Sequence, residues 1–271
     1  MKREDAVKEV EHLQRLSHAH IVRLIGTYII EDGKNFYILM YPVVDFDLER
    51  FLEKISDAAE DGAPQDFLAA ADASLKSFFS CLVATLDFLQ KRNVKHMDIK
   101  PKNILVRDVR QSILAHDCAY KVYLADFGIA RAYSSPTESE TTSPTAFTRL
   151  YSAPEVVAQE TRGFKADVFS LGCVYAEMLA TLARQRDQLD TTRQRSFQAE
   201  IPAVQQFLRE LVFQEPEVYL WNTRSRAMIS QLPKDRPSAK NIMDSIRDHK
   251  SYCCDQGSEP LESAKETEHQ W

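Results

Sequence analysis

The sequence predicts an α+β protein in which a small part, made of one helix and a two-stranded hairpin, precedes a large helical part. Apolar residues recur at helical spacing from about residue 2 to residue 16. Two strand-like runs then flank an Asp-Gly step at residues 32–33, which is a strong signal for a hairpin turn. A long amphipathic pattern occupies residues 74–92, and further helical stretches follow residue 167.

The first helix is predicted from an apolar stripe of Val7, Val10, Leu13 and Leu16. The strands of the hairpin are expected at residues 21–30 and 35–40. Two strands alone are marginally stable and have unpaired edges. We therefore expect the first helix or another chain to cover this hairpin.

The large part is predicted to begin with a short helix at residues 47–52. The Ala-, Asp- and Gly-rich stretch 56–72 is expected to be a surface insertion, and residues 74–92 the next helix. Residues 107–120 are long and polar, which indicates an inserted surface loop, and residues 251–271 form a polar tail without periodicity.

Residues 96–103, with the sequence His-Met-Asp-Ile-Lys-Pro-Lys-Asn, contain the side chains that phosphoryl transfer requires. Asp98 in a tight loop can accept the proton of an attacking hydroxyl group. Lys100 can steady a transferred phosphate, and Asn103 can hold a magnesium ion from the same loop. The spacing therefore predicts a catalytic loop for phosphoryl transfer.

This loop resembles the His-Arg-Asp-Leu-Lys-Pro-Glu-Asn loop of eukaryotic protein kinases. Four more motifs of that superfamily follow in its order: Asp126-Phe127-Gly128, Ala153-Pro154-Glu155, Asp167-Val168-Phe169-Ser170-Leu171-Gly172-Cys173, and Arg236 in Asp235-Arg236-Pro237. On these motifs the chain is identified as a member of the superfamily, and Lys100 resembles the serine/threonine-directed type.

The resemblance implies ATP and Mg2+ as cofactors, with Asp98 as the catalytic base and Lys100 on the transferred phosphate. It also implies Asn103 and Asp126 as the metal ligands. The nucleotide base would lie against the hinge between the two lobes and against a leucine floor. The residues implied there are Met40, Tyr41, Val43 and Leu105.

Other positions are implied to support the site rather than to react. Thr148 would orient the substrate peptide, and Glu155 and Arg236 would form a buried ion pair. His96 and Phe127 would stack with Leu13 and Leu24 in a column joining the lobes, with Asp167 anchoring its base. Met97 departs from the family, because a thioether cannot bind the activation-segment phosphate that an arginine holds there.

In the family, a glycine-rich strand pair and a strand lysine precede the segment that begins here near Glu9. We therefore expect a truncated small lobe at residues 1–40, a hinge at 41–46, a C-lobe at 47–250 and a tail at 251–271. Glu9 would lack its lysine partner. Transfer by this chain is expected to be about two to four powers of ten slower than in ordinary kinases.

Two other functions remain open: a catalytically inactive interaction or scaffold protein that keeps the kinase-like lobe, and, ranked behind it, a metabolite or aminoglycoside phosphotransferase. The formal net charge of −6 gives no basic surface for nucleic acid. Five cysteines without metal-ligand spacing, a charged N-terminus and no uninterrupted apolar run of about 18 residues favour an intracellular protein without a membrane partner. The expected partners are a protein substrate with a Ser or Thr hydroxyl and a chain covering the hairpin edge.

Overall fold

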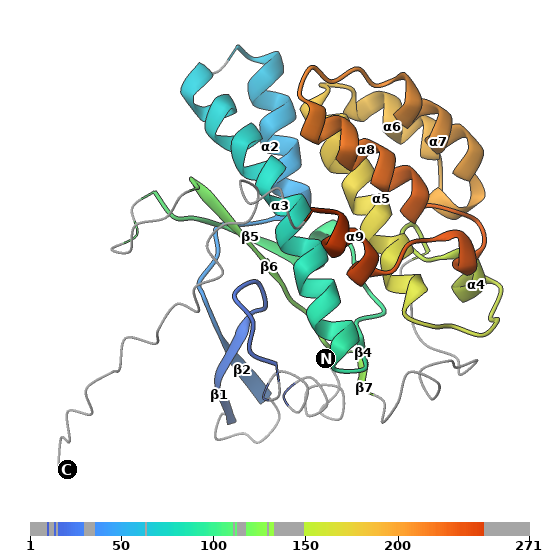
Figure 1. Ribbon diagram of the computed structural model, residues 1–271. Coiled ribbons are helices and arrows are strands. Elements are labelled where there is room, and N and C mark those ends of the chain that lie inside the picture. The colour runs from blue at the N-terminus through green and yellow to red at the C-terminus, as the bar shows by residue number, and fades with distance from the viewer. Residues whose placement is uncertain are drawn as a thin grey trace.

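The computed structural model describes residues 10, 14, 16–29, 36–62, 64–110, 112, 118–128, 130–132 and 149–246. Among these residues, helices make up the large lobe at one end of the molecule, and a small two-stranded sheet lies at the opposite end (Figure 1). The α+β prediction with a large helical lobe is therefore confirmed.

The small sheet pairs β1 (Arg23–Ile29) with β2 (Phe36–Tyr41) in antiparallel order. The register runs from Arg23 opposite Tyr41 to Ile29 opposite Phe36, with an irregularity between Leu24 and Gly26. The predicted hairpin is thus present. β2 continues one residue beyond the predicted strand, so Tyr41 belongs to the strand.

The segment before β1 joins this hairpin to the rest of the molecule. Val22 N donates to Leu124 O (3.0 Å), and Leu124 N donates to His20 O (2.8 Å). Leu124 ends β6 (Tyr120–Leu124), which pairs with β5 (Ile104–Asp108); β5 in turn pairs with the short β3 (Phe46–Asp47). These bonds place the hairpin beside the three-stranded sheet.

The prediction of a short helix followed by a surface insertion is wrong. α2 runs from Leu48 to Glu60 and α3 from Gln65 to Lys91. The carboxylate of Asp47 caps α2 by accepting from Arg50 N (2.8 Å). Buried side chains occur within the supposed insertion, at Leu68 and Ala71 in α3. The alanine-rich composition taken as a loop signal is also a strong helix signal.

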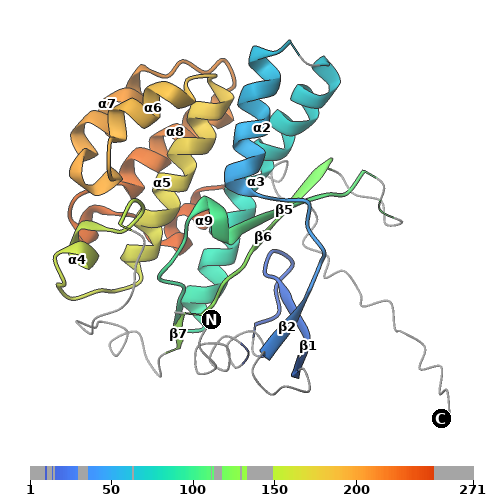
Figure 2. The same cartoon turned by 180° about the vertical axis from the view of Figure 1, so that it is seen from behind.

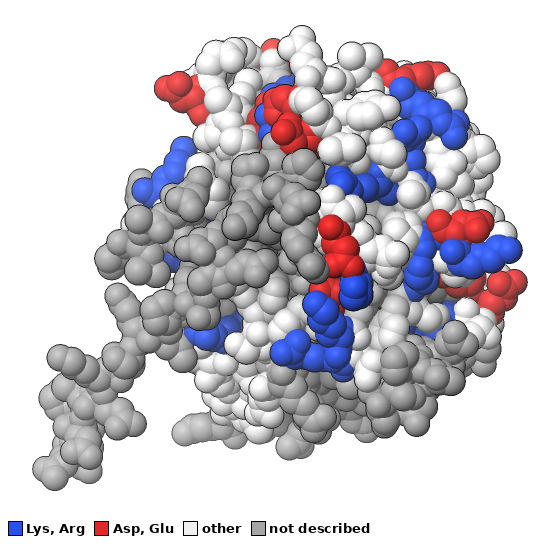
Figure 3. All heavy atoms as spheres, viewed as in Figure 1, with Lys and Arg blue, Asp and Glu red and all other residues white. Residues whose placement is uncertain are grey.

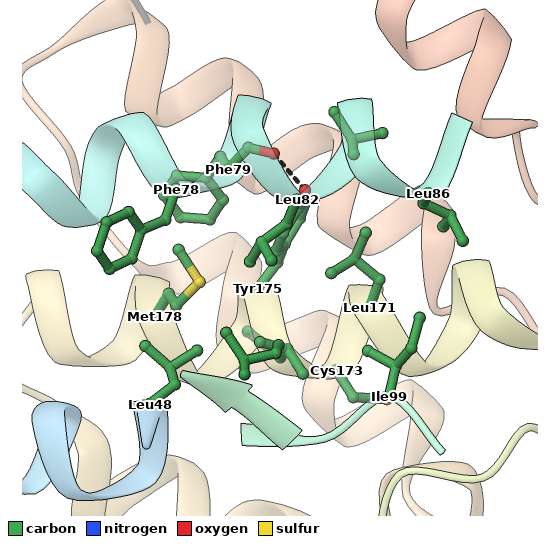
Figure 4. Packing of buried hydrophobic residues seen from close by; sticks show 14 of the residues in the cluster. Leu48, Phe78, Phe79, Leu82, Leu86, Ile99, Leu171, Cys173, Tyr175 and Met178 are labelled. Atoms are coloured by element: carbon green, nitrogen blue, oxygen red, sulfur yellow. Dashed lines mark hydrogen bonds between the residues drawn. The ribbon is translucent and has the colours of Figure 1, made fainter. Parts of the chain in front are cut away.

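α3 is the central helix of the large lobe and packs against α5 (Lys165–Leu182) (Figure 4). The Tyr175 hydroxyl of α5 donates to the Phe79 carbonyl of α3, so this buried hydroxyl is satisfied. α3 is also long and apolar enough to cross a membrane. Because 61% of its most apolar window is buried inside the molecule, its composition is explained by the core.

The remaining elements surround this core, and Figure 2 shows them from behind. They are β4 (Val94–Lys95), β7 (Arg131–Ala132), α4 (Pro154–Val157), α6 (Arg186–Arg193), α7 (Ile201–Glu210), α8 (Pro216–Met228), α9 (Ala239–Ile246) and three 3₁₀ turns at Pro101–Asn103, Phe197–Ala199 and Pro233–Asp235.

The crossing of α5 and α8 depends on a glycine. A Cβ atom added to Gly172 would lie 2.7 Å from Met228 Cβ and 3.3 Å from its carbonyl carbon. We therefore predict that Gly172→Ala destabilises the protein by about 1–3 kcal/mol, because the helices must separate to admit a methyl group. Urea denaturation measures this loss. Gly26→Ala is the control for adding a methyl, since nothing lies within 4 Å of a Cβ there.

His18 predicts a pH dependence of stability. Its ring lies 4.8 Å from the Phe88 ring, and its Nδ1 accepts from His20 N (3.2 Å). Burial, and then the nearby His20 and Arg92, lower its pKa from 6.5 to about 4. The unfolded chain therefore binds more protons between these values, and stability rises with pH across that window.

Allowing for the partial exposure of His18, we expect this rise to be about 1–2 kcal/mol between pH 4 and pH 6.5. In His18→Asn, which keeps an acceptor near Nδ1, this part of the pH dependence should disappear. Denaturation at several pH values tests it. The same slope in both proteins would contradict the prediction.

Candidate active site

The predicted catalytic loop follows β4 and presents Asp98, Lys100 and Asn103 together. Lys100 Nζ donates to Asp98 Oδ2 at 2.6 Å. Asn103 Nδ2 donates to the same oxygen and to the Asp98 main-chain carbonyl, both at 2.9 Å. One carboxylate oxygen is therefore oriented by an ammonium and an amide, as a positioned proton acceptor requires.

The backbone of this loop is fixed by Asp167, near the start of α5. Asp167 Oδ2 accepts from His96 N and Oδ1 accepts from Met97 N, each at 2.8 Å. Met97 has a φ of 69°, which is unfavourable for a side chain of its kind. Burial raises the pKa of Asp167 although both amides favour its charged form. The hydrogen bonds therefore hold a strained residue directly before Asp98.

Asn103 and Asp126 lie at the same end of the β5–β6 ladder. Ile104 pairs with Leu124, and Ala125 N donates to Asn103 O at 2.9 Å. Asp126 follows at once, exposed and with a φ of 63°. This register brings together the ends of the two segments that carry the implied metal ligands.

These two side chains suit a magnesium ion by their donor chemistry. Mg2+ prefers oxygen ligands and commonly takes one or two from the protein, with phosphate and water oxygens completing its shell. With its amide nitrogen on Asp98, Asn103 has its side-chain oxygen left for a cation. Among the residues that the structure describes, no three His, Cys, Asp or Glu side chains cluster as a metal site. A metal here would therefore also need ligands from the nucleotide.

The predicted hinge residues lie where β2 ends. Met40 and Tyr41 are the last residues of the strand, and Val43 is 83% exposed beyond it. Asp45 N donates to Val106 O (3.0 Å), and Asp47 pairs with Leu105. The hinge segment is thereby held along β5, beside the half-buried Leu105.

The catalytic loop and the Asp126-Phe127-Gly128 motif are joined by a ring contact. The buried rings of His96 and Phe127 lie 4.8 Å apart, edge to face. His96 Nε2 is also 3.0 Å from Ala125 O. Leu24 packs partly buried against the core, whereas Leu13, Glu9 and Thr148 fall outside the described residues.

Glu155 and Arg236 form the buried ion pair that the sequence predicted. The two guanidinium nitrogens Nη1 and Nη2 each donate to one Glu155 oxygen, at 2.7 and 2.8 Å. The remaining donors of Arg236 reach the carbonyls of Lys165, Ser230 and Gln231. This fully bonded arginine connects α4 to the start of α5 and to the turn before α9.

A second buried cluster near the site was missed in the sequence. The Tyr151 hydroxyl donates to Glu177 Oε1 at 2.8 Å, and Arg193 Nη2 lies 3.7 Å from the same oxygen. Burial raises the pKa of Glu177 and of Tyr151. The cluster fixes residues 149–153 against α5. The available signal was a glutamate within the apolar run of that helix.

Comparisons with known proteins agree with this geometry. The family model of the protein kinase domain matches residues 1–249. Cyclin-dependent kinase 4 of Ovis aries is 34% identical over 177 residues, covering 64% of this chain and 51% of the relative. Cell division control protein 2 homolog 3 of Trypanosoma brucei brucei is 34% identical over 174 residues, covering 64% and 48%. Cyclin-dependent kinase 7 of Dictyostelium discoideum is 31% identical over 175 residues, covering 64% and 41%.

The chain therefore belongs to the protein kinase family. The match spans about half the length of the curated relatives, between 41% and 51% in these three.

The Glu155–Arg236 pair gives a stability prediction. Arg236→Met leaves the Glu155 carboxylate buried without its cation, which should cost about 3–5 kcal/mol. Combining it with Glu155→Gln should recover part of this loss, because no buried charge is then left. The matched control is Lys240→Met, which breaks the exposed pair with Asp244 and should change stability by less than about 0.5 kcal/mol. Equal effects at the two sites in urea denaturation would contradict this account.

Proposed function

We propose that this chain carries the phosphoryl-transfer site of a protein serine/threonine kinase. The observation that supports this most directly is the double orientation of Asp98 Oδ2 by Lys100 and Asn103. In this proposal Asp98 accepts the proton of the substrate hydroxyl as the oxygen attacks. Lys100 then steadies the transferred phosphate while keeping Asp98 in place.

The cofactors proposed are ATP, which supplies the phosphoryl group, and Mg2+. Asn103 and Asp126 would hold the metal from the end of the β5–β6 ladder. The backbone of Tyr41 and Val43 would bind the adenine edge, with Met40 and Leu105 against its faces.

We further propose the division into residues 1–40, 41–46, 47–250 and 251–271 as small-lobe part, hinge, C-lobe and tail. The C-lobe proposal agrees with the continuous packing of α2, α3 and α5. Glu9 is proposed to be the glutamate of the first helix that lacks its lysine partner, and Thr148 is proposed to orient the substrate peptide. The proposed location is intracellular.

The substrate proposed is a protein bearing a Ser or Thr hydroxyl. A partner chain on the hairpin edge is also proposed, because β1 and β2 pair only with each other among the described strands. Two of the relatives compared are named as cyclin-dependent kinases, which is consistent with dependence on a partner protein.

An inactive interaction protein is the second candidate, and the exposed apolar surface of the hairpin favours it. Ile25, Tyr28, Ile29, Leu39 and Met40 are each 40% exposed or more. Exposed apolar side chains gathered on one surface are typical of a protein-binding site, and catalysis does not need them.

Asp98→Asn tests the proposal. The asparagine keeps the shape of the side chain but cannot take a proton, so phosphate transfer to a protein substrate should fall by about 10²- to 10⁴-fold. The melting temperature should change little, because the asparagine keeps a side-chain oxygen that can accept from Lys100 and Asn103. Radiolabel transfer from ATP to a generic basic protein measures the rate.

A thermal shift with ATP and Mg2+ separates the two candidates. At one hundred times the dissociation constant, binding should stabilise the protein by about 2.7 kcal/mol, in the wild type and in Asp98→Asn alike. No shift at millimolar nucleotide together with no transfer would favour the inactive interaction protein.

A further inference from the structure

A cavity of about 200 Å³ lies behind the hinge. It is lined by residues of the segment from Leu16 to Arg23, by Tyr41 and Pro42, and by Lys121 and Tyr123 of β6. None of these lining residues is acidic. Successive strand side chains point to opposite faces, so Tyr41 faces this cavity from the side of β2 opposite to Met40.

Among the described residues, the cavity carries positive charge with no acidic side chain in its lining. Arg23 is half-buried and makes no hydrogen bond or ion pair with a described residue. Arg107 contacts a lining residue, because its Nη1 lies 3.5 Å from Tyr41 Oη, and among the described residues its guanidinium lies near tyrosines rather than carboxylates.

Arg107 also stands directly opposite Lys121 in the β5–β6 ladder. Like charges in this position destabilise a sheet. Lys121 has interactions of its own, so the spare charge is that of the two arginines. His18 adds none at neutral pH, because burial lowers its pKa to about 4. An anion that enters the cavity would offset this positive charge.

An exposed strip continues from the cavity along the hairpin. Tyr41, Leu39 and Tyr37 alternate on one face of β2, and Arg23 and Tyr28 stand opposite Tyr41 and Tyr37. The rings of Tyr28 and Tyr37 are stacked, with centroids 4.7 Å apart. We call Arg23, Tyr41, Leu39, Tyr28 and Tyr37 the hairpin strip.

The strip has a notch at its centre. Leu39 is 49% exposed and stands opposite Gly26, where an added Cβ would meet nothing within 4 Å. An apolar side chain from another molecule could lie there against Leu39, two strand residues away from the cavity.

We propose that the cavity and the hairpin strip together dock an extended acidic segment of a partner protein. Its carboxylate enters the cavity between Arg23 and Arg107, and an apolar residue two positions away covers Leu39. A carboxylate fits because a guanidinium binds it through two parallel hydrogen bonds. A side chain fits better than a free ligand, because sites for small molecules usually enclose about 300–1,000 Å³.

This proposal does not rest on the proposed catalytic function, since none of its residues belongs to the catalytic loop. The probe is a fluorescein-labelled peptide, Gly-Leu-Ser-Glu-Ser-Leu-Gly, whose sequence reads the same in both directions. Fluorescence anisotropy with the full chain should show saturable binding. Arg23→Gln and Leu39→Ser should each weaken it by about five- to tenfold.

Arg209→Gln is the matched control, because Arg209 is an exposed arginine on α7, and binding should stay within about twofold. A peptide with Gln in place of Glu should bind to the wild-type protein about as weakly as the Glu peptide binds to the Arg23→Gln variant. Unchanged melting temperatures show that the variants fold.

Three results would overturn the proposal. The first is no saturable binding up to about 1 mM peptide, the range of the weakest specific complexes. The second is equal binding of free N-acetylglutamate, which would make the cavity a small-anion site. The third is self-association of the wild-type protein, measured by sedimentation, that is lost in Arg23→Gln. That result would make a second copy of this chain the occupant.

Discussion

The two hydrogen bonds from the amides of His96 and Met97 to Asp167 are the constraint on which the site depends. They satisfy a fully buried carboxylate and hold Met97 in a left-handed conformation. The backbone before Asp98 is therefore fixed, and with it the direction of the Asp98 side chain. The same loop brings the His96 ring onto Phe127. Because Asp167 belongs to α5, the position of the Asp98 carboxylate depends on the helical core.

The packing of that core depends on one hydrogen bond and on one close approach between helices. The Tyr175 hydroxyl bonds to the carbonyl of Phe79, and Gly172 allows α8 to approach α5 as closely as the backbone permits. On the described part of the face in Figure 3, acidic and basic side chains are interspersed. The contacts that fix the core therefore lie in the interior, whereas the proposed recognition surfaces lie at the hairpin and at the end of the β5–β6 ladder.

Sequence patterns predicted the hairpin, the central helix and the association of Asp98 with Lys100 and Asn103, because each depends on local spacing. They failed at residues 56–72, where aspartate and glycine favour a loop but alanine favours a helix, and burial of Leu68 and Ala71 against the lobe decides. The Tyr151–Glu177 contact joins residues 26 apart in sequence, and the Arg107–Lys121 pairing depends on strand register. No local spacing encodes such contacts.

The β5–β6 ladder connects the proposed catalytic site with the proposed docking cavity. At one end Ile104 pairs with Leu124 beside Asn103 and Asp126; three residues along, Arg107 pairs with Lys121 beside the cavity. Three strand residues span about 10 Å, so the two places share one rigid element. Tyr41 faces the cavity, and its neighbour Met40 points to the other face of β2. A segment bound behind the hinge would therefore restrain the strand end from which a nucleotide would be recognised, without occupying the space of that nucleotide.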